Sequence, residues 1–230
     1  PAASKDFVSE ASGLLCGARV LLTEDNRMNQ QVATEILESA GITVEVANNG
    51  REAVEAVSRG EYDLVLMDIQ MKEMGGYEAV KIIRSDPGNA RLPIIAMTAH
   101  AMAGAKEECI AAGMNDYVSK PIDPAALFSV LIKWLKPGEY PAEPAVLPEF
   151  YEVEEFPANL PGFSVEEGIR RVIGDRKLYR EIITDFFKHY AQAPSEIKEY
   201  LVNGDYERAG FLLHTVKGVA GNISAVRIFE

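Results

Sequence analysis

Polar residues stand directly after four apolar, β-rich runs of the sequence. Glu24 and Asp25 follow "RVLLT", Asp68 follows "LVLM", Thr98 follows "IIAM" and Lys120 follows "YVS". In a parallel sheet all of these positions would fall on one edge, where such sheets bind their ligands. Three carboxylates there repel each other unless a cation lies among them, and hard oxygen ligands favour Mg2+. The lysine and the hydroxyl would then contact a phosphoryl group, whose transfer depends on positioning and charge neutralisation.

Each of these residues also has an ordinary structural explanation. An aspartate after a strand is more often a turn former or a helix cap, and a threonine there suits a β-strand. Lys120 would by itself be an ordinary surface lysine. These explanations weaken because all the positions converge on one edge of the expected sheet.

A second candidate for chemistry is His214, in the stretch "FLLHTVKGVAG". The stretch has helical spacing, yet it contains Gly218 and Gly221 and follows Gly210, and a glycine inside a helix costs roughly 1 kcal/mol. On a helical wheel the glycines lie within about 40° of His214 and Lys217 lies about 60° away. We expect the glycines to leave room for a protein surface that approaches the imidazole. The alternative is that they permit close packing with a neighbouring helix.

The elements that would position the first cluster alternate between two hydrophobic periods. The expected strands are 18–24, 42–47, 62–68, 92–98 and 116–119, and the expected helices are 27–40, 50–59, 76–85, 101–112 and 123–135. Continuous apolar strands that alternate with helices indicate a parallel sheet covered on both faces. The sequence therefore predicts a doubly wound α/β domain with a five-stranded parallel sheet.

The composition divides the chain of 230 residues into four parts. Six of the twelve prolines fall within residues 137–162, where glutamates are frequent, and this indicates an extended linker. We therefore expect an N-terminal linker over 1–17, the α/β domain over 18–136 and an all-α segment over 163–230.

The C-terminal segment has two amphipathic stretches. The first runs over 175–191, with Asp175 as its N-cap, and the chain is expected to break or restart its helix at Pro194 and to end it at Asn203-Gly204. Its apolar stripe contains Leu178, Ile182, Ile183, Phe186, Phe187 and Tyr190. The second stretch is capped by Asp205, and its apolar arc contains Ala209, Leu212, Leu213, Val216, Ala220 and Ile223. These stretches predict a helical hairpin.

The overall composition excludes several classes of function. The formal net charge of −12 repels nucleic acid, so no nucleic-acid partner is expected. No apolar run approaches the ~18 residues of a membrane span. Cys16 and Cys109 are too few for a disulfide framework or a zinc site. A cytoplasmic location is the expectation, while membrane attachment elsewhere in a longer parent protein stays open.

Four motifs resemble those of response-regulator receiver domains: "LLTEDNRMNQ", "VLMDIQM", "IIAMTAHAM" and "DYVSKPID". The "MTAHAM" segment is similar to the versions in hybrid histidine kinases. The resemblance implies a flavodoxin-like fold and Mg2+ as cofactor. It implies that Asp68 is the phospho-acceptor and that Asp25, Asp68 and the backbone carbonyl of Gln70 bind the metal, with Glu24 completing the acidic pair.

The same resemblance implies roles for four more residues. Thr98 and Lys120 would contact the phosphoryl oxygens, Tyr117 would be an aromatic rotamer switch, and the bond between Lys120 and Pro121 would be cis. The loop after Asp68 departs from the family. Its "MKEMGG" replaces the frequent "MPxMDG", so the next helix lacks its usual aspartate cap and the loop is expected to be looser.

The C-terminal motifs "HTVKGVAGNI" and "GDRKLYREIITDFF" resemble histidine phosphotransfer (HPt) domains. This resemblance implies that Nε2 of His214 carries a phosphoryl group, that Lys217 assists and that Gly218 gives access. It also implies a four-helix bundle, of which the segment would supply only a hairpin. We therefore expect the segment to be loosely ordered or to associate with a second copy.

The two resemblances together imply a phosphorelay fragment of a hybrid sensor histidine kinase. Its partners would be an upstream histidine kinase core and a downstream receiver or HPt protein. No glycine-rich nucleotide loop is found, so the ATP-dependent step is expected to lie upstream. Two alternatives remain. One is a phosphatase with an aspartate nucleophile. Such phosphatases carry a D-x-D pattern, whereas Asp68 is followed by Ile69 and Gln70. The other is a docking module that has lost phosphorylation.

Overall fold

The computed structural model describes residues 11, 13–99, 105–136, 140, 157 and 160–229. The chain divides into two compact units, Pro1–Glu149 and Phe150–Glu230, and each is described by itself. The division falls inside the segment that the sequence predicts as a linker. Most of that segment, and most of the expected N-terminal linker over 1–17, lies outside the described residues.

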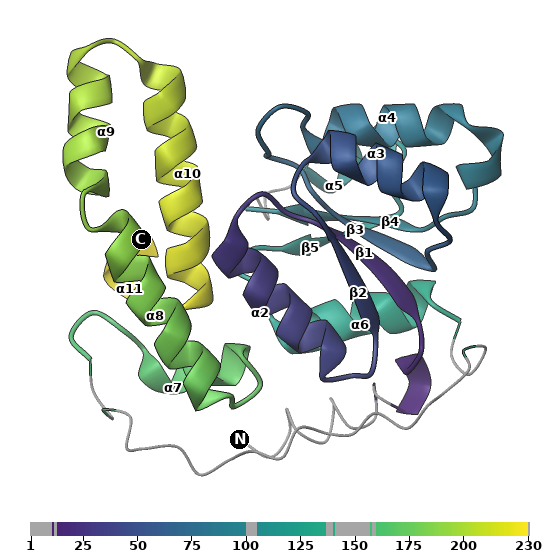
Figure 1. Ribbon diagram of the computed structural model, residues 1–230, viewed down its shortest axis with the longest axis horizontal. Helices are drawn as coiled ribbons and strands as arrows, with labels where there is room; N and C mark the ends of the chain where they lie inside the picture. The colour runs from purple at the N-terminus through teal and green to yellow at the C-terminus, as the bar shows by residue number, and fades with distance from the viewer. Residues whose placement is uncertain are drawn as a thin grey trace. The chain divides into compact units, whose positions relative to one another are not determined.

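The first unit is built on a five-stranded parallel sheet with the strand order β2-β1-β3-β4-β5 (Figure 1). The strands are β1 (Arg19–Thr23), β2 (Thr43–Ala47), β3 (Leu64–Asp68), β4 (Ile94–Thr98) and β5 (Asp116–Ser119). This confirms the predicted flavodoxin-like α/β class for the first unit. The order places β1, β3 and β4 side by side, so the three strands that carry Glu24, Asp68 and Thr98 at or just beyond their ends are neighbours.

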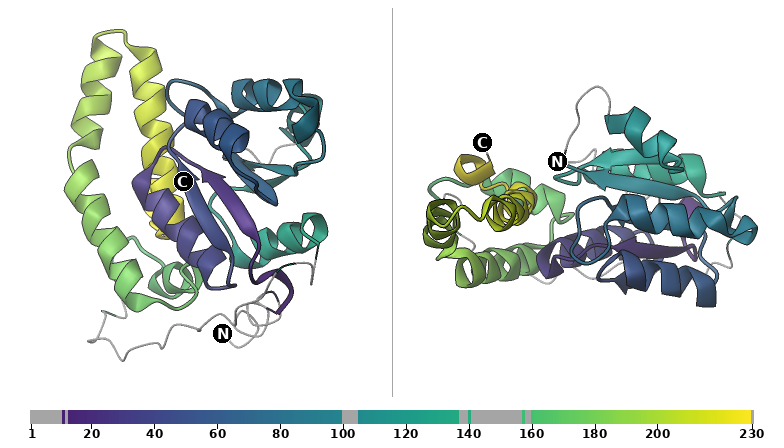
Figure 2. Two further views of the ribbon diagram at one scale, coloured as in Figure 1. Left: turned by 45° about the vertical axis from the view of Figure 1, so that its right-hand side comes forward. Right: turned by 90° about the horizontal axis from the view of Figure 1, so that it is seen from above.

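Helices cover both faces of this sheet. They are α2 (Arg27–Glu38), α3 (Gly50–Arg59), α4 (Gly76–Ser85), the short 3-10 helix η1 (Pro87–Asn89), α5 (Ala105–Ala111) and α6 (Pro124–Trp134). The core on one face is formed with α3, α4 and α5, while α2 and α6 lie on the other face (Figures 1 and 2). The start of the expected helix 101–112 lies outside the described residues.

Burial along the strands explains why they appear as continuous apolar runs in the sequence. Every residue of β3 and β4 is buried, and β1 is buried after its first residue. The edge strand β2 is different, because all of its residues before Ala47 are at least partly accessible to solvent. A strand with helices on both faces needs apolar residues at every position, whereas an edge strand does not.

The second unit contains five helices within its described residues. They are α7 (Val165–Arg171), α8 (Arg176–Tyr190), α9 (Ala193–Val202), α10 (Tyr206–Asn222) and α11 (Val226–Phe229). A helical hairpin is present, but α9 packs along α10 (Figure 1), whereas the sequence predicted that the stretch 175–191, which forms α8, would be the partner of α10. The short helices α7 and α11 pack against α8 and α10 respectively.

The predicted helix boundaries of this unit are confirmed. The side chain of Asp175 accepts from the N–H of Leu178, and that of Asp205 accepts from the N–H of Arg208. Pro194 lies in the first turn of α9, where it removes no helical hydrogen bond. Gly204 has a φ of +75°, so it ends the preceding helix in a conformation that glycine adopts without strain.

The apolar stripe on α8 differs from the expectation at two positions. Phe187 was expected to be buried, but it is 52% exposed. Tyr179, which the stripe omitted, is fully buried, and its hydroxyl donates to the carbonyl of Ile223 at 2.9 Å. Gly168 makes room for this ring, because a Cβ at Gly168 would lie 2.3 Å from Tyr179. Tyrosine can be buried at this position because its hydroxyl has a hydrogen-bond acceptor there. The periodicity of the apolar residues alone did not include Tyr179 in the stripe.

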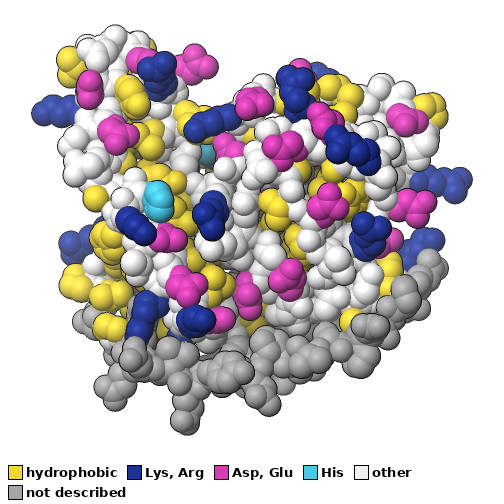
Figure 3. Space-filling view, viewed as in Figure 1, with side chains coloured by type: hydrophobic (Ala, Val, Ile, Leu, Met, Phe, Trp, Pro, Cys, Tyr) yellow, Lys and Arg dark blue, Asp and Glu magenta, His cyan; other side chains and the backbone are white. Residues whose placement is uncertain are grey.

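The described surface carries charges of both signs. On the face seen in Figure 3, Lys and Arg side chains alternate with Asp and Glu side chains and form no continuous basic stripe. Among the residues that the structure describes, none of the helices combines the length and the apolar character that a membrane crossing requires.

Candidate functional site

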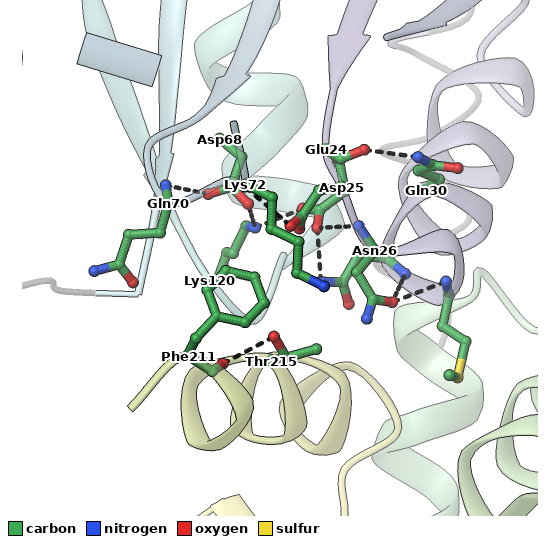
Figure 4. A network of polar contacts seen from close by, with 12 residues as sticks. Glu24, Asp25, Asn26, Gln30, Asp68, Gln70, Lys72, Lys120, Phe211 and Thr215 are labelled. Carbon is green, nitrogen blue, oxygen red and sulfur yellow. Dashed lines mark hydrogen bonds and ion pairs between the residues drawn. The ribbon is translucent and has the colours of Figure 1, made fainter. Parts of the chain in front are cut away.

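Three carboxylates meet where β1 and β3 end. Glu24, Asp25 and Asp68, called the acidic cluster below, each offer an oxygen atom, and these atoms lie within 4.8 Å of one another. Glu24 and Asp68 are buried, while Asp25 is partly exposed. The sequence predicted this convergence from strand ends alone, and the parallel register of β1 with β3 brings it about. Figure 4 shows the three side chains directed toward a common centre.

A buried lysine joins two members of the cluster. The Nζ atom of Lys120 lies 2.5 Å from Oε2 of Glu24 and 2.6 Å from Oδ2 of Asp68. Its backbone N–H donates to the carbonyl of Thr98 at 2.7 Å, which ties the end of β5 to the end of β4. The peptide bond between Lys120 and Pro121 is cis, as predicted. Lys120 is therefore held against the predicted phospho-acceptor by both its backbone and its ion pairs.

Residues at the start of α2 hold the Glu24 carboxylate in place. Oε1 of Glu24 accepts from the N–H of Asn26 at 3.2 Å and from Nδ2 of Asn29 at 3.0 Å. Asn26 is also the N-cap of α2, and Gln30 donates from its side chain to the Glu24 carbonyl at 2.6 Å. The sequence interpretation missed Asn29 and Gln30. The signal available in the sequence was the polar run "EDNRMNQ" at a strand-to-helix junction. In the structure Asn29 is buried, which is unusual for asparagine.

The electrostatics of the cluster are unfavourable without a further cation. Burial raises the pKa of the Asp68 carboxyl to about 7, and the negative charge of Glu24 acts in the same direction. The Lys120 ammonium and the N–H of Gln70, which donates to Oδ1 of Asp68 at 3.2 Å, oppose this rise. Burial and the charge of Glu24 also raise the pKa of Asp25. An added cation would favour the ionised form of both carboxyls.

The remaining predicted residues of this site lie at the same edge of the sheet. Thr98 is buried at the end of β4, one residue beyond Met97, which is the partner of Asp68 in the sheet. Tyr117 lies on β5 beside Ala96, is partly buried and packs against the core cluster of α3, α4 and α5. The structure thus brings Thr98 to the cluster's edge and places Tyr117 on the neighbouring strand, as the sequence predicts.

The loop after Asp68 shows the consequence of the missing cap residue. Helix α4 begins after Gly75, and no side chain accepts from its first N–H groups. Glu73 adopts a φ of +65°, a conformation that is uncommon for residues other than glycine, asparagine and aspartate. The expected absence of the cap is confirmed, whereas the expected looseness of the loop stays a prediction.

The second candidate site surrounds His214 on α10. His214 and Lys217 line a groove of about 660 Å³ together with apolar residues of α8, α9, α10 and α11. The apolar lining residues are Phe186, Phe187, Tyr190, Ala191, Ala193, Pro194, Ile197, Leu213, Val216 and Ile228. His214 is partly buried and Lys217 is exposed. The histidine therefore stands at the border of an apolar groove, which the sequence interpretation did not foresee.

Two expectations about α10 were wrong. Leu213 was assigned to the buried arc but is 51% exposed, and it lines the groove. The three glycines were expected to clear one exposed surface, yet only Gly210 is exposed, Gly218 is partly buried and Gly221 is buried. The reason is that the chain folds back after Asn222, so that α11 packs against the C-terminal part of α10. Only part of the expected clearing around His214 is present.

The first unit has counterparts among known proteins. Residues 20–132 match the model of the response regulator receiver domain family. These residues form a receiver domain. It is of the two-component phosphorelay type and is homologous to the receiver domains of hybrid histidine kinases.

Two curated relatives that match most of the chain are named as a histidine-protein kinase and a sensor protein. The chain is 33% identical over 202 residues to the signal transduction histidine-protein kinase BarA of Escherichia coli K12. This match covers 88% of this chain and 22% of that protein. It is 37% identical over 168 residues to the sensor protein GacS of Pseudomonas syringae, covering 72% of this chain and 18% of that one. The chain thus spans about a fifth of the length of these relatives.

Among solved structures, the receiver domain is similar to that of the sensor histidine kinase PA1611 from Pseudomonas aeruginosa PAO1. The two are 42% identical, with a TM-score of 0.49, over 52% of this chain and 98% of that one. That structure is described as having a magnesium ion coordinated in its active site cleft.

Proposed function

We propose that the chain is a phosphorelay fragment of a hybrid sensor histidine kinase, with two reactive side chains. Asp68 of the receiver domain accepts a phosphoryl group from a phosphohistidine, and His214 of the helical unit carries one. The observation that supports Asp68 is its position between Lys120 and the two other carboxylates of the acidic cluster, at the carboxyl edge of the sheet. The observation that supports His214 is its exposed neighbour Lys217 at the rim of the same groove.

The proposed reaction at Asp68 is a direct displacement at phosphorus. An Oδ atom of the ionised carboxylate forms the new P–O bond as the P–N bond of the phosphohistidine breaks, and the electron pair of that bond returns to the imidazole nitrogen. The Lys120 ammonium, already 2.6 Å from Oδ2, would turn to the phosphoryl oxygens and neutralise part of their charge. The Thr98 hydroxyl at the end of β4 would donate to another of these oxygens.

The residues present fit a magnesium ion. Their donors are carboxylate oxygens within 4.8 Å of one another, which is the ligand type that Mg2+ prefers. Burial raises the pKa values of Asp25 and Asp68, and a cation would lower them. Asp25, Asp68 and the backbone carbonyl of Gln70 would hold the ion, with Glu24 completing the acidic set. The ion, when bound, supplies positive charge next to the transferred phosphoryl group.

Two further residues would respond to the modified aspartate. Lys120 would exchange its ion pair with Asp68 for one with the phosphoryl group, which draws the end of β5 toward β3. Tyr117 lies on β5, three residues before Lys120, and is proposed as the aromatic side chain that changes rotamer with this movement.

The helical unit is proposed to act as the histidine phosphotransfer part. Nε2 of His214 would carry the phosphoryl group, the Lys217 ammonium would neutralise its charge, and Gly218 would leave the imidazole accessible to an incoming receiver. The partners implied are an upstream histidine kinase core and a downstream receiver or HPt protein. The fragment would work in the cytoplasm, in a parent protein that is open to membrane attachment elsewhere.

Labelling with a small phosphodonor tests the first half of the proposal. Wild-type protein with acetyl phosphate and Mg2+ should acquire one alkali-labile phosphate, and Asp68→Asn should acquire none. Asp86→Asn is the matched control, because Asp86 is an exposed receiver aspartate that caps η1, away from the acidic cluster. Undiminished Mg2+-dependent labelling of Asp68→Asn would overturn the acceptor assignment.

Transfer from a phosphorylated receiver tests the second half. His214→Gln should block formation of an acid-labile, alkali-stable phosphate, while His189→Gln should not, because His189 is an exposed histidine of α8 whose ring contacts the Asp185 carbonyl. Gly218→Leu should slow transfer nearly as much as His214→Gln by steric exclusion. Transfer at the wild-type rate in Gly218→Leu would refute the access argument.

The apolar groove beside His214 supports self-association of the helical unit. Phe187, Leu213 and Ile228 expose about half of their surfaces along it, and apolar surface of this kind usually acquires a partner. Two helical units would then form one bundle. Light scattering should give a dimer mass for the wild-type chain and a monomer mass for Phe187→Glu. A monodisperse wild-type monomer would remove this part of the proposal.

A further inference from the structure

The loop between Asp68 and α4 is held by backbone hydrogen bonds. The N–H of Gly76 donates to the carbonyl of Ile69 at 3.0 Å, and the N–H of Gly50 donates to that of Met74 at 3.1 Å. Gly76 packs closely on the preceding strand, since a Cβ there would lie 2.3 Å from the Asp68 carbonyl oxygen. Residue 72 lies on the short loop between the end of β3 and these anchors.

Lys72 occupies this position beside Asp25. Its backbone N–H donates to Oδ2 of Asp25 at 3.4 Å, and Figure 4 draws the two residues next to each other. Burial and the charge of Glu24 raise the pKa of Asp25, while the N–H of Lys72, the Lys120 ammonium and, least of all, the Lys72 ammonium act to lower it. The other two carboxylates instead share the buried ammonium of Lys120. The acidic cluster thus faces two cations of the chain itself, one buried and one exposed.

We propose that Lys72 sets the affinity of the acidic cluster for divalent cations, weakening Mg2+ binding through the positive charge that it places beside Asp25. The inference rests on the magnesium site of the proposed function and adds the residue that tunes it. Lys72 is a positioning and charge-setting residue, because its side chain acts through Asp25 and through the local potential. As a consequence, the occupancy of the site still varies with Mg2+ concentration in a range at which a cluster without the Lys72 charge would already be saturated.

The size of the effect follows from the exposure of the side chain. Lys120 cannot be removed without leaving buried carboxylates unpaired, whereas Lys72 is exposed and acts largely through solvent. In a medium close to water, one unit charge at about 6–12 Å from a divalent ion changes its affinity by about three- to tenfold. Salt should reduce this factor, because the screening length falls to about 3 Å at 1 M ionic strength.

Calorimetric titration of the intact chain with MgCl2 tests the inference without measuring phosphorylation. Lys72→Gln keeps the backbone N–H and removes the charge, and it should bind Mg2+ about three- to tenfold more tightly than wild type at low ionic strength. Lys72→Arg keeps the charge and should match wild type. Lys81→Gln removes an exposed charge from α4, and it should also match wild type. The difference between wild type and Lys72→Gln should shrink as NaCl is added.

Three results would overturn the inference. Equal affinity of wild type and Lys72→Gln would show that the charge does not reach the bound ion. Weaker binding by Lys72→Gln would assign Lys72 to the support of Asp25, and tighter binding by both Lys72→Gln and Lys72→Arg would assign the effect to side-chain shape. Absence of Mg2+ binding to the wild type would instead refute the metal site of the proposed function, and this inference with it, so the two failures are distinguishable.

Discussion

Asp68 and His214, the two residues proposed to carry phosphoryl groups, stand in opposite surroundings. Asp68 is buried at a sheet edge, ion-paired to Lys120, with hydrogen-bonded Glu24 beside it and a pKa raised to about 7. His214 stands on one helix, partly exposed, at the rim of an apolar groove.

The surroundings of Asp68 and His214 differ because different elements of the fold supply the neighbouring residues. The receiver site is assembled from the ends of four strands and the loops that follow them, so its charges are desolvated together and must compensate one another. At the histidine site, the neighbours of His214 at i+3 and i+4 are set by the geometry of α10, while residues of α8, α9 and α11 complete the groove beside it. The first site is therefore expected to be coupled to stability and pH, whereas the exposed Lys217 of the second is expected to contribute little to stability.

The largest expected effect is the loss of the buried cation. Lys120→Met should lower the free energy of unfolding of the receiver domain by about 3–5 kcal/mol at pH 8 in EDTA, because Glu24 and Asp68 are left without their shared partner. Fluorescence of Trp134, the single tryptophan, reports on this domain during urea unfolding. Lys217→Met on α10 is the comparison and should cost below about 0.5 kcal/mol. A loss below about 1 kcal/mol in Lys120→Met would mean that the two sites are less different than their burial indicates.

The second largest effect on stability is expected from one methyl group added to the receiver domain. Gly76→Ala should destabilise the receiver domain by about 2–3 kcal/mol, since its Cβ would lie 2.3 Å from the Asp68 carbonyl oxygen and the backbone would have to shift. The measurement is again urea unfolding followed by Trp134. If Gly76→Ala were as stable as wild type, the close approach of α4 to the end of β3 would be wrong.

The pH dependence of stability should separate the sites in the absence of metal. The pKa of Asp68 is raised in the folded protein to about 7, so the folded state binds more protons and its free energy of unfolding falls as pH rises through 7. Asp68→Asn should remove this loss and be about 1–2 kcal/mol more stable than wild type at pH 8 in EDTA, with a smaller difference near pH 4. Parallel stability curves for the two proteins between pH 4 and 8 would contradict the assignment.

The smallest effect is expected on α10. Gly210→Ala should stabilise that helix by about 0.5–1 kcal/mol, because no atom lies within 4 Å of the added Cβ and alanine is the better helix former. Slower amide hydrogen exchange along α10 would register the gain. Phosphotransfer at His214 should be unchanged, since Gly210 has open space around it. A destabilised α10 would mean that Gly210 is needed for packing, as in the alternative weighed from the sequence.

Much of the receiver domain could be predicted from the sequence because its determinants are local. The strands that are covered on both faces are unbroken apolar runs, and each catalytic candidate follows such a run within one or two residues. The caps Asp175 and Asp205 in the helical unit were predicted for the same reason, since a cap interacts with N–H groups three residues away. Asn29 and Gln30 escaped prediction because their partner, Glu24, is reached only once α2 has folded against the end of β1.

The sequence by itself determined the parallel α/β order, the edge at which Glu24, Asp25, Asp68 and Lys120 meet, and the ends of the long helices. These follow from hydrophobic periodicity and from hydrogen bonds between residues close in the chain. Only the tertiary structure decided that Tyr179 is buried, that Phe187 and Leu213 are exposed and that Gly221 is covered. A helical wheel gives the direction of a side chain but does not show which other helix lies in that direction. The helices α7 and α11 are too short for their packing to be predicted from hydrophobic periodicity.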